Sequence, residues 1–264
     1  MSSQKESTVR TLTVAVLVCL VCSVFVAGAA VALRPTQQQN ALLDKQRSIL
    51  AIAGLGEAGM SGKQVRELFN ERIVTRLVDL ETGKFSDEFE AKSFDPLAAA
   101  KDPQLSQALP AEQDIASIKR RERYSIVYIV EGQGEGAIDT LILPVRGYGL
   151  WSTLYGFMAL EGDLNTVAGL GFYQHGETPG LGGEVDNPKW RGLWPGKELF
   201  GDNGNLAIQV VKGGVDPKSP KADHQVDALA GATLTSNGVN NLLHFWLGEN
   251  GFGPFIANLR AGEA

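Results

Sequence analysis

The sequence YSIVYIVEGQGEGAIDTLILPV, residues 124–145, indicates the fold class of most of this chain. Two runs rich in β-branched residues, 124–131 and 137–145, are separated by the glycine-rich loop GQGEG, and this pattern predicts an antiparallel hairpin. Other apolar runs of strand length follow, at residues 156–163, 167–175 and 206–213.

Helical patterns flank these strands. Short helices are expected over residues 188–200 and 236–247, and in the second of these the apolar residues recur on one face: Val239, Leu242, Leu243 and Trp246. No internal repeat is visible. Residues 121–264 are therefore predicted to form an α+β domain with a largely antiparallel, twisted sheet and flanking helices.

Residues 34–120 are predicted to be a helical and loop region that packs on this domain. Ser61 is expected to cap a helix whose apolar stripe runs from Val65 to Ile73. Residues 81–84 indicate a turn, and the polar stretch 85–113, with its three prolines, indicates loop with short helical pieces.

An apolar segment, residues 11–33, contains 23 residues without a charge. At about 1.5 Å per residue a helix of this length spans roughly 35 Å, enough for a hydrocarbon core of about 30 Å. A cleaved signal peptide is the alternative, because Ala27 and Ala29 offer small residues for cleavage. The length of the run and its continuation to Leu33 favour a permanent single-pass anchor.

The tail before this segment, residues 1–10, carries Lys5 and Arg10 against Glu6. This weak positive-inside signal places the tail in the cytoplasm and the large domain on the periplasmic or outer side of the membrane.

The composition excludes some functions. With 24 basic and 30 acidic residues among 264, the chain lacks the basic stripe of a nucleic-acid binder. Its basic cluster, residues 119–123, is interpreted as a solvated edge. The two cysteines, Cys19 and Cys22, both lie in the apolar segment, so no disulfide or cysteine metal site is expected in the soluble part. The pair itself is interpreted as small packing residues, with a redox or shared metal site as the alternative.

The motif DALAGAT, residues 227–233, has two interpretations. In the first, Gly231 makes a tight bend, and Thr233, Thr235 or Ser236 caps the following helix. In the second, the amides of the helix start form an anion site, Thr233 accepts a phosphoryl group, and Asp227 holds the metal used during the transfer.

The same motif resembles the signature Asp-x-x-Ser/Thr-Gly-Ala-Thr, at which flavin transferases attach FMN to threonine through a phosphodiester. Asp227, Gly231, Ala232 and Thr233 match it, while Ala230 stands in the Ser/Thr position. Residues 147–182, which contain G-x-G-L-W and H-x-E-T-P-G-L-G elements, are similar to the FMN-binding domain in the C subunit of the sodium-translocating NADH:quinone reductases. That domain is shared with the G subunit of Rnf-type electron-transport complexes.

This resemblance implies covalent FMN on Thr233, and the segments around it supply candidate contacts. Leu150 and Trp151 are expected to line the isoalloxazine, with a core position after a strand as the alternative interpretation of Trp151. Glu177 and Thr178 are expected to hydrogen-bond flavin or ribityl groups, unless their loop is an ordinary solvent loop. The other expected cofactor-binding residues are Gly149, Ser152, Leu181, Gly182, Lys212, Gly231 and Ala232.

The resemblance also implies a flavoprotein subunit in the bacterial inner membrane, with its main domain in the periplasm. Such a subunit relays electrons inside a sodium-pumping NADH:quinone reductase, with other subunits as partners and a flavin transferase acting during maturation. The sequence has no G-x-G-x-x-G motif that follows a strand and opens a helix, so NADH oxidation is expected in a partner. The alternatives are an Rnf-type subunit and a membrane-tethered assembly module without a redox role.

Overall fold

The computed structural model describes residues 7–57, 59–134 and 136–264. The chain divides into two compact units, Met1–Asp44 and Lys45–Ala264. Most of the expected cytoplasmic tail, residues 1–6 with Lys5 and Glu6, lies outside the described residues. The expected division into segments, with its boundary between residues 120 and 121, stays a prediction.

The first helix, α1 (Thr8–Ile52), contains the predicted apolar segment 11–33. It is long and apolar enough to cross a membrane, and its apolar window is fully exposed to the surroundings. Cys19 and Cys22 are both exposed and unoxidised in it. Among the described residues no group of three or more His, Cys, Asp or Glu side chains could hold a metal ion.

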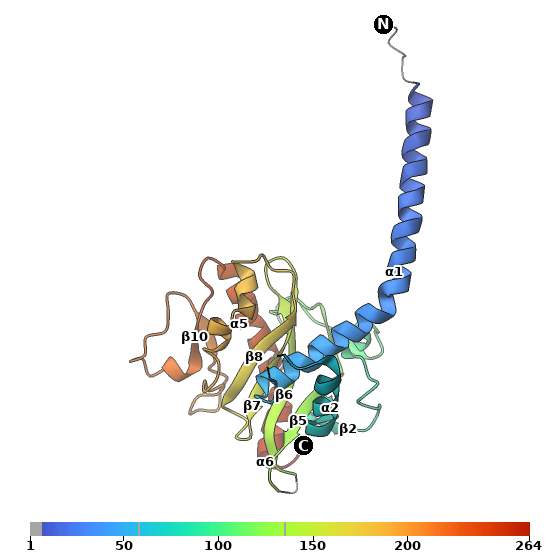
Figure 1. The fold of residues 1–264 in the computed structure, drawn as a ribbon. Helices are drawn as coiled ribbons and strands as arrows, with labels where there is room; N and C mark the ends of the chain where they lie inside the picture. The colour runs from blue at the N-terminus through green and yellow to red at the C-terminus, as the bar shows by residue number, and fades with distance from the viewer. Residues whose placement is uncertain (1–6, 58, 135) are drawn as a thin grey trace. The chain divides into compact units, whose positions relative to one another are not determined.

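A six-stranded sheet forms the centre of the second unit (Figure 1). Its order is β2-β1-β5-β6-β7-β8, and every neighbouring pair is antiparallel, which confirms the predicted sheet. The strands are β1 (Ile73–Asp79), β2 (Lys84–Ser86), β5 (Tyr124–Glu131), β6 (Ile138–Tyr148), β7 (Thr153–Glu161) and β8 (Val167–Gln174).

Two small sheets accompany the large one. In one, β3 (Ser106–Ala108) pairs antiparallel with β4 (Arg120–Glu122); in the other, β9 (Gln209–Val211) pairs parallel with β10 (Gln225–Asp227).

The structure corrects the sequence prediction for residues 73–113. The helix α2 (Gly62–Arg72) begins at Ser61 with a capping box, as expected, but Ile73 is extended and opens β1. The β-branched residues that follow pair along the whole length of β1 with β5, so tertiary pairing outweighs the helical spacing. The stretch expected to be loop with short helical pieces contains the short helix α3 (Pro96–Ala99), as expected, but also the strands β2 and β3.

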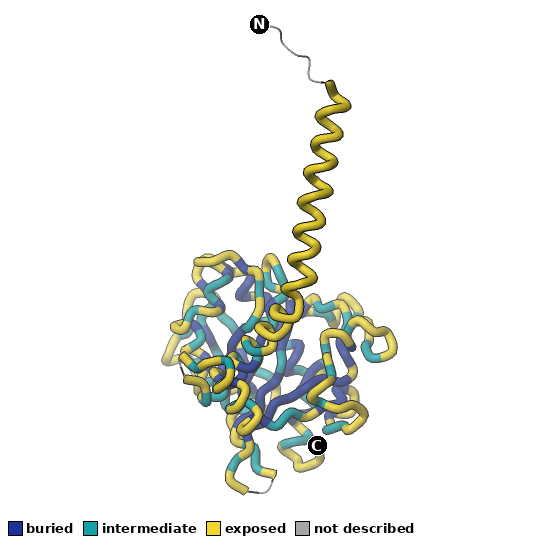
Figure 2. Tube along the Cα trace, turned by 45° about the vertical axis from the view of Figure 1, so that its right-hand side comes forward, coloured by how far each residue is buried: buried dark blue, intermediate teal, exposed yellow. Residues whose placement is uncertain are grey.

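Helices cover both faces of the large sheet (Figure 1). The last turns of α1, from Lys45 onward, and α2 lie on one face; α5 (Thr233–Leu247) and α6 (Gly253–Ala261) lie on the other. The expected apolar face of α5 is fully buried in the core. Figure 2 shows buried segments in the interior of the second unit and exposed ones at its surface. Short helical turns complete the second unit: η1 (Gly182–Asp186), α4 (Pro188–Arg191) and η2 (Ala222–His224).

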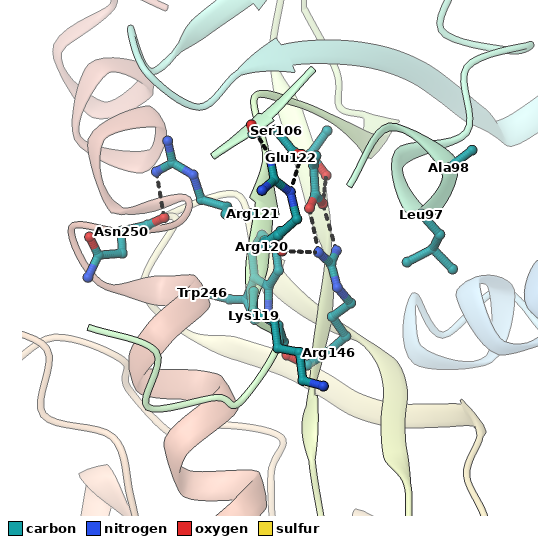
Figure 3. Close-up of polar contacts among 12 residues, drawn as sticks. Leu97, Ala98, Ser106, Lys119, Arg120, Arg121, Glu122, Arg146, Trp246 and Asn250 are labelled. Carbon is teal, nitrogen blue, oxygen red and sulfur yellow. Dashed lines mark hydrogen bonds and ion pairs between the residues drawn. The ribbon is translucent and has the colours of Figure 1, made fainter. Parts of the chain in front are cut away.

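The basic cluster at residues 119–123 is a solvated edge only in part: Lys119 and Arg123 are exposed, as expected, but the middle of the cluster is buried. Arg121 and Glu122 are 8% and 1% exposed. The Arg146 guanidinium donates to both carboxylate oxygens of Glu122, at 2.8 and 2.6 Å, and Arg121 donates to the Asn250 carbonyl (Figure 3). Glu122 interrupts the cluster because it is the buried partner of an arginine that lies 24 residues away in the sequence.

Candidate functional site

The helix α5 begins inside the DALAGAT motif without a side-chain cap. Its N-cap residue is Ala232, and no capping side chain accepts a hydrogen bond from the backbone amides of its first turn. The expectation that Thr233, Thr235 or Ser236 caps this helix is wrong, because all three lie within its first turn. Free amides at a helix start, together with the helix dipole, favour a bound anion.

The first turn of α5 separates exposed from buried side chains. Thr233 and Leu234 are exposed, whereas Thr235 and Ser236 are 1% and 3% exposed. Within the described part of the chain, the Thr233 hydroxyl makes no hydrogen bond to another residue. The turn therefore presents one hydroxyl outward and directs the next two into the protein.

Ser236 fixes the bend that leads into the helix. Its hydroxyl accepts from the Leu229 amide and donates to the Ala232 carbonyl, both at 3.0 Å. Between these two residues Gly231 has φ +73°, a left-handed conformation that glycine adopts without strain.

Glu177 is the polar centre of the site, and the residue is only 5% exposed. Its Oε1 accepts from the amides of Leu150, Trp151 and Ser152, at 3.0, 3.0 and 3.3 Å. Its Oε2 accepts from the Thr235 hydroxyl at 2.7 Å. One carboxylate thus joins three chain segments: the loop after β6, the loop after β8 and the start of α5.

These hydrogen bonds stabilise the ionised carboxylate. Burial disfavours the charge, but the donors from Thr235, Trp151, Leu150 and Ser152 outweigh it and hold the pKa of Glu177 below its usual value. Glu177 is therefore ionised at neutral pH and supplies an internal anion to its four donors.

The signature glycines make room for this junction. A Cβ on Gly149 would lie 2.6 Å from Glu177 Oε1, and one on Gly182 would lie 2.5 Å from Thr235 Oγ1. A Cβ on Gly238 of α5 would lie 2.5 Å from the Tyr148 carbonyl oxygen. At each of these glycines the backbone lies close to another group of the chain itself.

Exposed apolar side chains surround the start of α5. Trp151 is 67% exposed, so it is not a core residue, and Leu181 and Leu234 are 47% and 58% exposed. Leu150, whose amide is held by Glu177, is 38% exposed. A Cβ built on Gly231 would lie 3.4 Å from Leu181, which places this leucine against the bend. Large apolar groups that gather around an exposed hydroxyl are suited to an aromatic ligand attached there.

Three other predicted site residues lie outside the hydrogen bonds around Glu177: Asp227, Thr178 and Lys212. The Asp227 carboxylate accepts from the Val215 amide at 2.6 Å and so orders the loop between β9 and β10. Thr178 is exposed, and its carbonyl accepts from the amides of Leu181 and Gly183. Lys212 is exposed directly after β9, and the nearby Val210 amide donates to Asn240 of α5.

Sequence reasoning missed the roles of Thr235, Ser236 and Gly238. The first two were considered only as caps, and each makes a hydrogen bond to a loop or to a side chain outside its own turn. A buried glutamate needs several hydrogen-bond donors, and this requirement is the one signal in the sequence that could have indicated such partners.

Comparisons with known proteins agree with this geometry. Residues 149–248 match the FMN-binding domain family. A protein of Pseudomonas aeruginosa, the C subunit of its Na(+)-translocating NADH-quinone reductase, is 72% identical over 262 residues, which cover 99% of this chain and 100% of that protein. The chain belongs to the family of these C subunits, the NqrC family.

Other NqrC proteins extend this relationship. The C subunit from Yersinia pestis is 52% identical over 97% of this chain and 95% of its own length. The crystal structure of NqrC from Shewanella oneidensis superimposes with a TM-score of 0.75 at 38% identity, and the match covers 86% of this chain and 99% of that one. The resemblance that residues 147–182 carry, and the α+β fold, are both confirmed.

Proposed function

We propose that this NqrC-family chain carries FMN covalently on Thr233 and relays electrons within a Na⁺-translocating NADH-quinone reductase. The observation that carries the proposal is the exposed Thr233 hydroxyl at the uncapped start of α5, among exposed apolar side chains. The match of residues 149–248 to the FMN-binding domain family supports the identity of the cofactor.

The residues present fit FMN. Leu150, Trp151, Leu181 and Leu234 offer apolar surface for a flat ring system, and the first-turn amides of α5 suit an ester-linked phosphate. Among the predicted contacts, Ser152, Thr178 and Lys212 add polar groups at the edge, and Gly149, Gly182, Gly231 and Ala232 shape the backbone. When bound, FMN supplies the one-electron chemistry, and the chain supplies position, polarity and shielding.

Maturation requires a flavin transferase that recognises this motif. The Asp227 carboxylate is the residue we assign to metal recognition during the transfer, as its place in the signature implies. Ala230, in the Ser/Thr position, is exposed and has no side-chain hydrogen-bonding group, so the bend forms without that hydroxyl.

The membrane helix and the partners complete the proposal. The apolar part of α1 anchors the protein in the bacterial inner membrane, and residues 121–264 form the FMN-binding domain on the periplasmic side. NADH oxidation and sodium passage belong to other subunits of the complex. The similarity to NqrC proteins favours this complex over an Rnf-type one.

The test is flavinylation of the full-length protein, coexpressed with a flavin transferase. The denatured protein should fluoresce under ultraviolet light on a gel, and its intact mass should exceed that of the bare chain by one FMN less one water. Both signals should be lost in Thr233→Ala and kept in Thr82→Ala, which removes an exposed threonine from a distant turn.

A dark band of unmodified mass, with a known acceptor protein modified in parallel, contradicts the proposal. It would leave the membrane-tethered assembly module as the function of this chain.

A further inference from the structure

Thr235 connects the proposed acceptor to the interior of the protein. It lies two residues after Thr233 in the same turn of α5, but it is buried and donates to Glu177, which is 58 residues away in the sequence. Because an α-helix is rigid over a single turn, a contact that fixes the direction of Thr235 also fixes the direction of Thr233.

The same carboxylate also fixes the loop that carries Trp151. Three consecutive amides, of Leu150, Trp151 and Ser152, converge on Glu177 Oε1. The acceptor helix and the exposed apolar loop are therefore held to one another through a single ionised side chain. The carboxylate lies close against Gly149 and Gly182, since a Cβ atom at either position would come within 2.6 Å of one of its oxygens.

We propose that Glu177, acting through Thr235, is a positioning residue that orients the Thr233 hydroxyl for flavin transfer and sets it beside the Leu150–Trp151 loop. This rests on the proposed function. It replaces the direct flavin contact expected for Glu177 with a role that its four chain donors already define.

The step that this positioning serves is a phosphoryl-group exchange. The Thr233 oxygen forms a P–O bond to the FMN phosphate of a flavin dinucleotide donor and loses its proton to a base of the transferase. The pyrophosphate P–O bond breaks, and the nucleoside monophosphate leaves. Nothing is oxidised or reduced, and misorientation of the attacking oxygen lowers the rate of this step directly.

The test uses the full-length protein in detergent with a purified flavin transferase, FAD and Mg²⁺, and follows the modified fraction by intact mass. Thr235→Val, which keeps the shape but removes the hydroxyl, should lower kcat about tenfold while the KM for FAD stays within about twofold. Thr235→Ser, which restores the hydroxyl, should recover the wild-type rate to within about twofold.

The matched control is Thr140→Val, the same change at a buried threonine of β6 that is 6% exposed. It should leave the flavinylation rate unchanged, and thermal unfolding of each bare protein reports whether it is folded. If Thr235→Val does not fold, Glu177→Gln is the deciding variant. It keeps the side-chain oxygen that accepts from the three amides but removes the charge. A tenfold loss of kcat in this variant supports the proposal.

Modification of the deciding variant at the wild-type rate overturns the positioning role, and so does a Thr235→Ser protein as slow as Thr235→Val. An unmodified wild-type chain is a different result, because it overturns the proposed function itself.

Discussion

At two positions of this domain, the neighbouring side chains leave space only for a glycine. Gly149 and Gly182 both face the Glu177 carboxylate, and Gly182 also faces the Thr235 hydroxyl. Neither has a left-handed φ, so the absence of a side chain matters here for space and not for backbone conformation.

Gly182→Ala should therefore destabilise the protein by about 1–3 kcal/mol, because the new methyl group overlaps a buried hydrogen bond. The free energy of unfolding from urea titration of the bare protein measures this. Gly201→Ala is the matched control, since a Cβ there meets its nearest atom at an ordinary 3.6 Å. Equal stabilities of the two variants would show that the junction around Glu177 has more room than the structure gives it.

At the scale of the elements, the junction that holds the loops after β6 and β8 to the start of α5 depends on the charge of Glu177. The pKa of this carboxyl lies below its usual value, because hydrogen bonds from Thr235 and from three amides outweigh the cost of burial. A lowered folded-state pKa gives stability that is fully present above the unfolded pKa of about 4.3 and is lost as the pH falls through the folded value.

We therefore expect wild type to be more stable than Glu177→Gln by a constant margin from about pH 6 to pH 8, and the margin to close below about pH 4. Thermal unfolding of both proteins across this range measures the difference, and other acidic groups affect both alike. A margin that persists unchanged at about pH 3 would contradict the assignment of this stability to the ionised carboxylate.

Across the second unit as a whole, the buried pair of Glu122 and Arg146 connects the small β3–β4 sheet to the large one. The side chains are 1% and 11% exposed. The indole of Trp246, from α5, donates to the Arg146 carbonyl at 2.7 Å, and its ring centroid lies 5.0 Å from the guanidinium. Three separate parts of the second unit meet at this pair.

Glu122→Ala should cost about 3–5 kcal/mol of unfolding free energy, because it leaves the Arg146 charge buried without its partner. Combining Glu122→Leu with Arg146→Met should cost less, since no charge then remains. The control is Glu67→Ala in the exposed Lys63–Glu67 pair, which should change stability by less than about 0.5 kcal/mol. A Glu122→Ala protein no more destabilised than this control would contradict the importance of the buried pair.

Elements that are specified by one short stretch of residues could be predicted from the sequence alone. Hairpins follow from β-branched runs around glycine loops, the apolar length of residues 11–33 predicts a spanning helix, and the spacing from Val239 to Trp246 predicts the buried face of α5. The resemblance to FMN-binding domains could also be recognised in the sequence, because each of its motifs is a contiguous stretch of residues.

What those motifs do depends on contacts that form only in the folded chain. Ile73 is part of a strand because it pairs with β5, and Glu122 is buried because it forms an ion pair with Arg146. Glu177 and Thr235 met across the fold, with three amides that no spacing rule connects to them. Hydrogen bonds between segments far apart in the sequence form only where long-range packing brings those segments together. A single sequence contains no local signal for that packing.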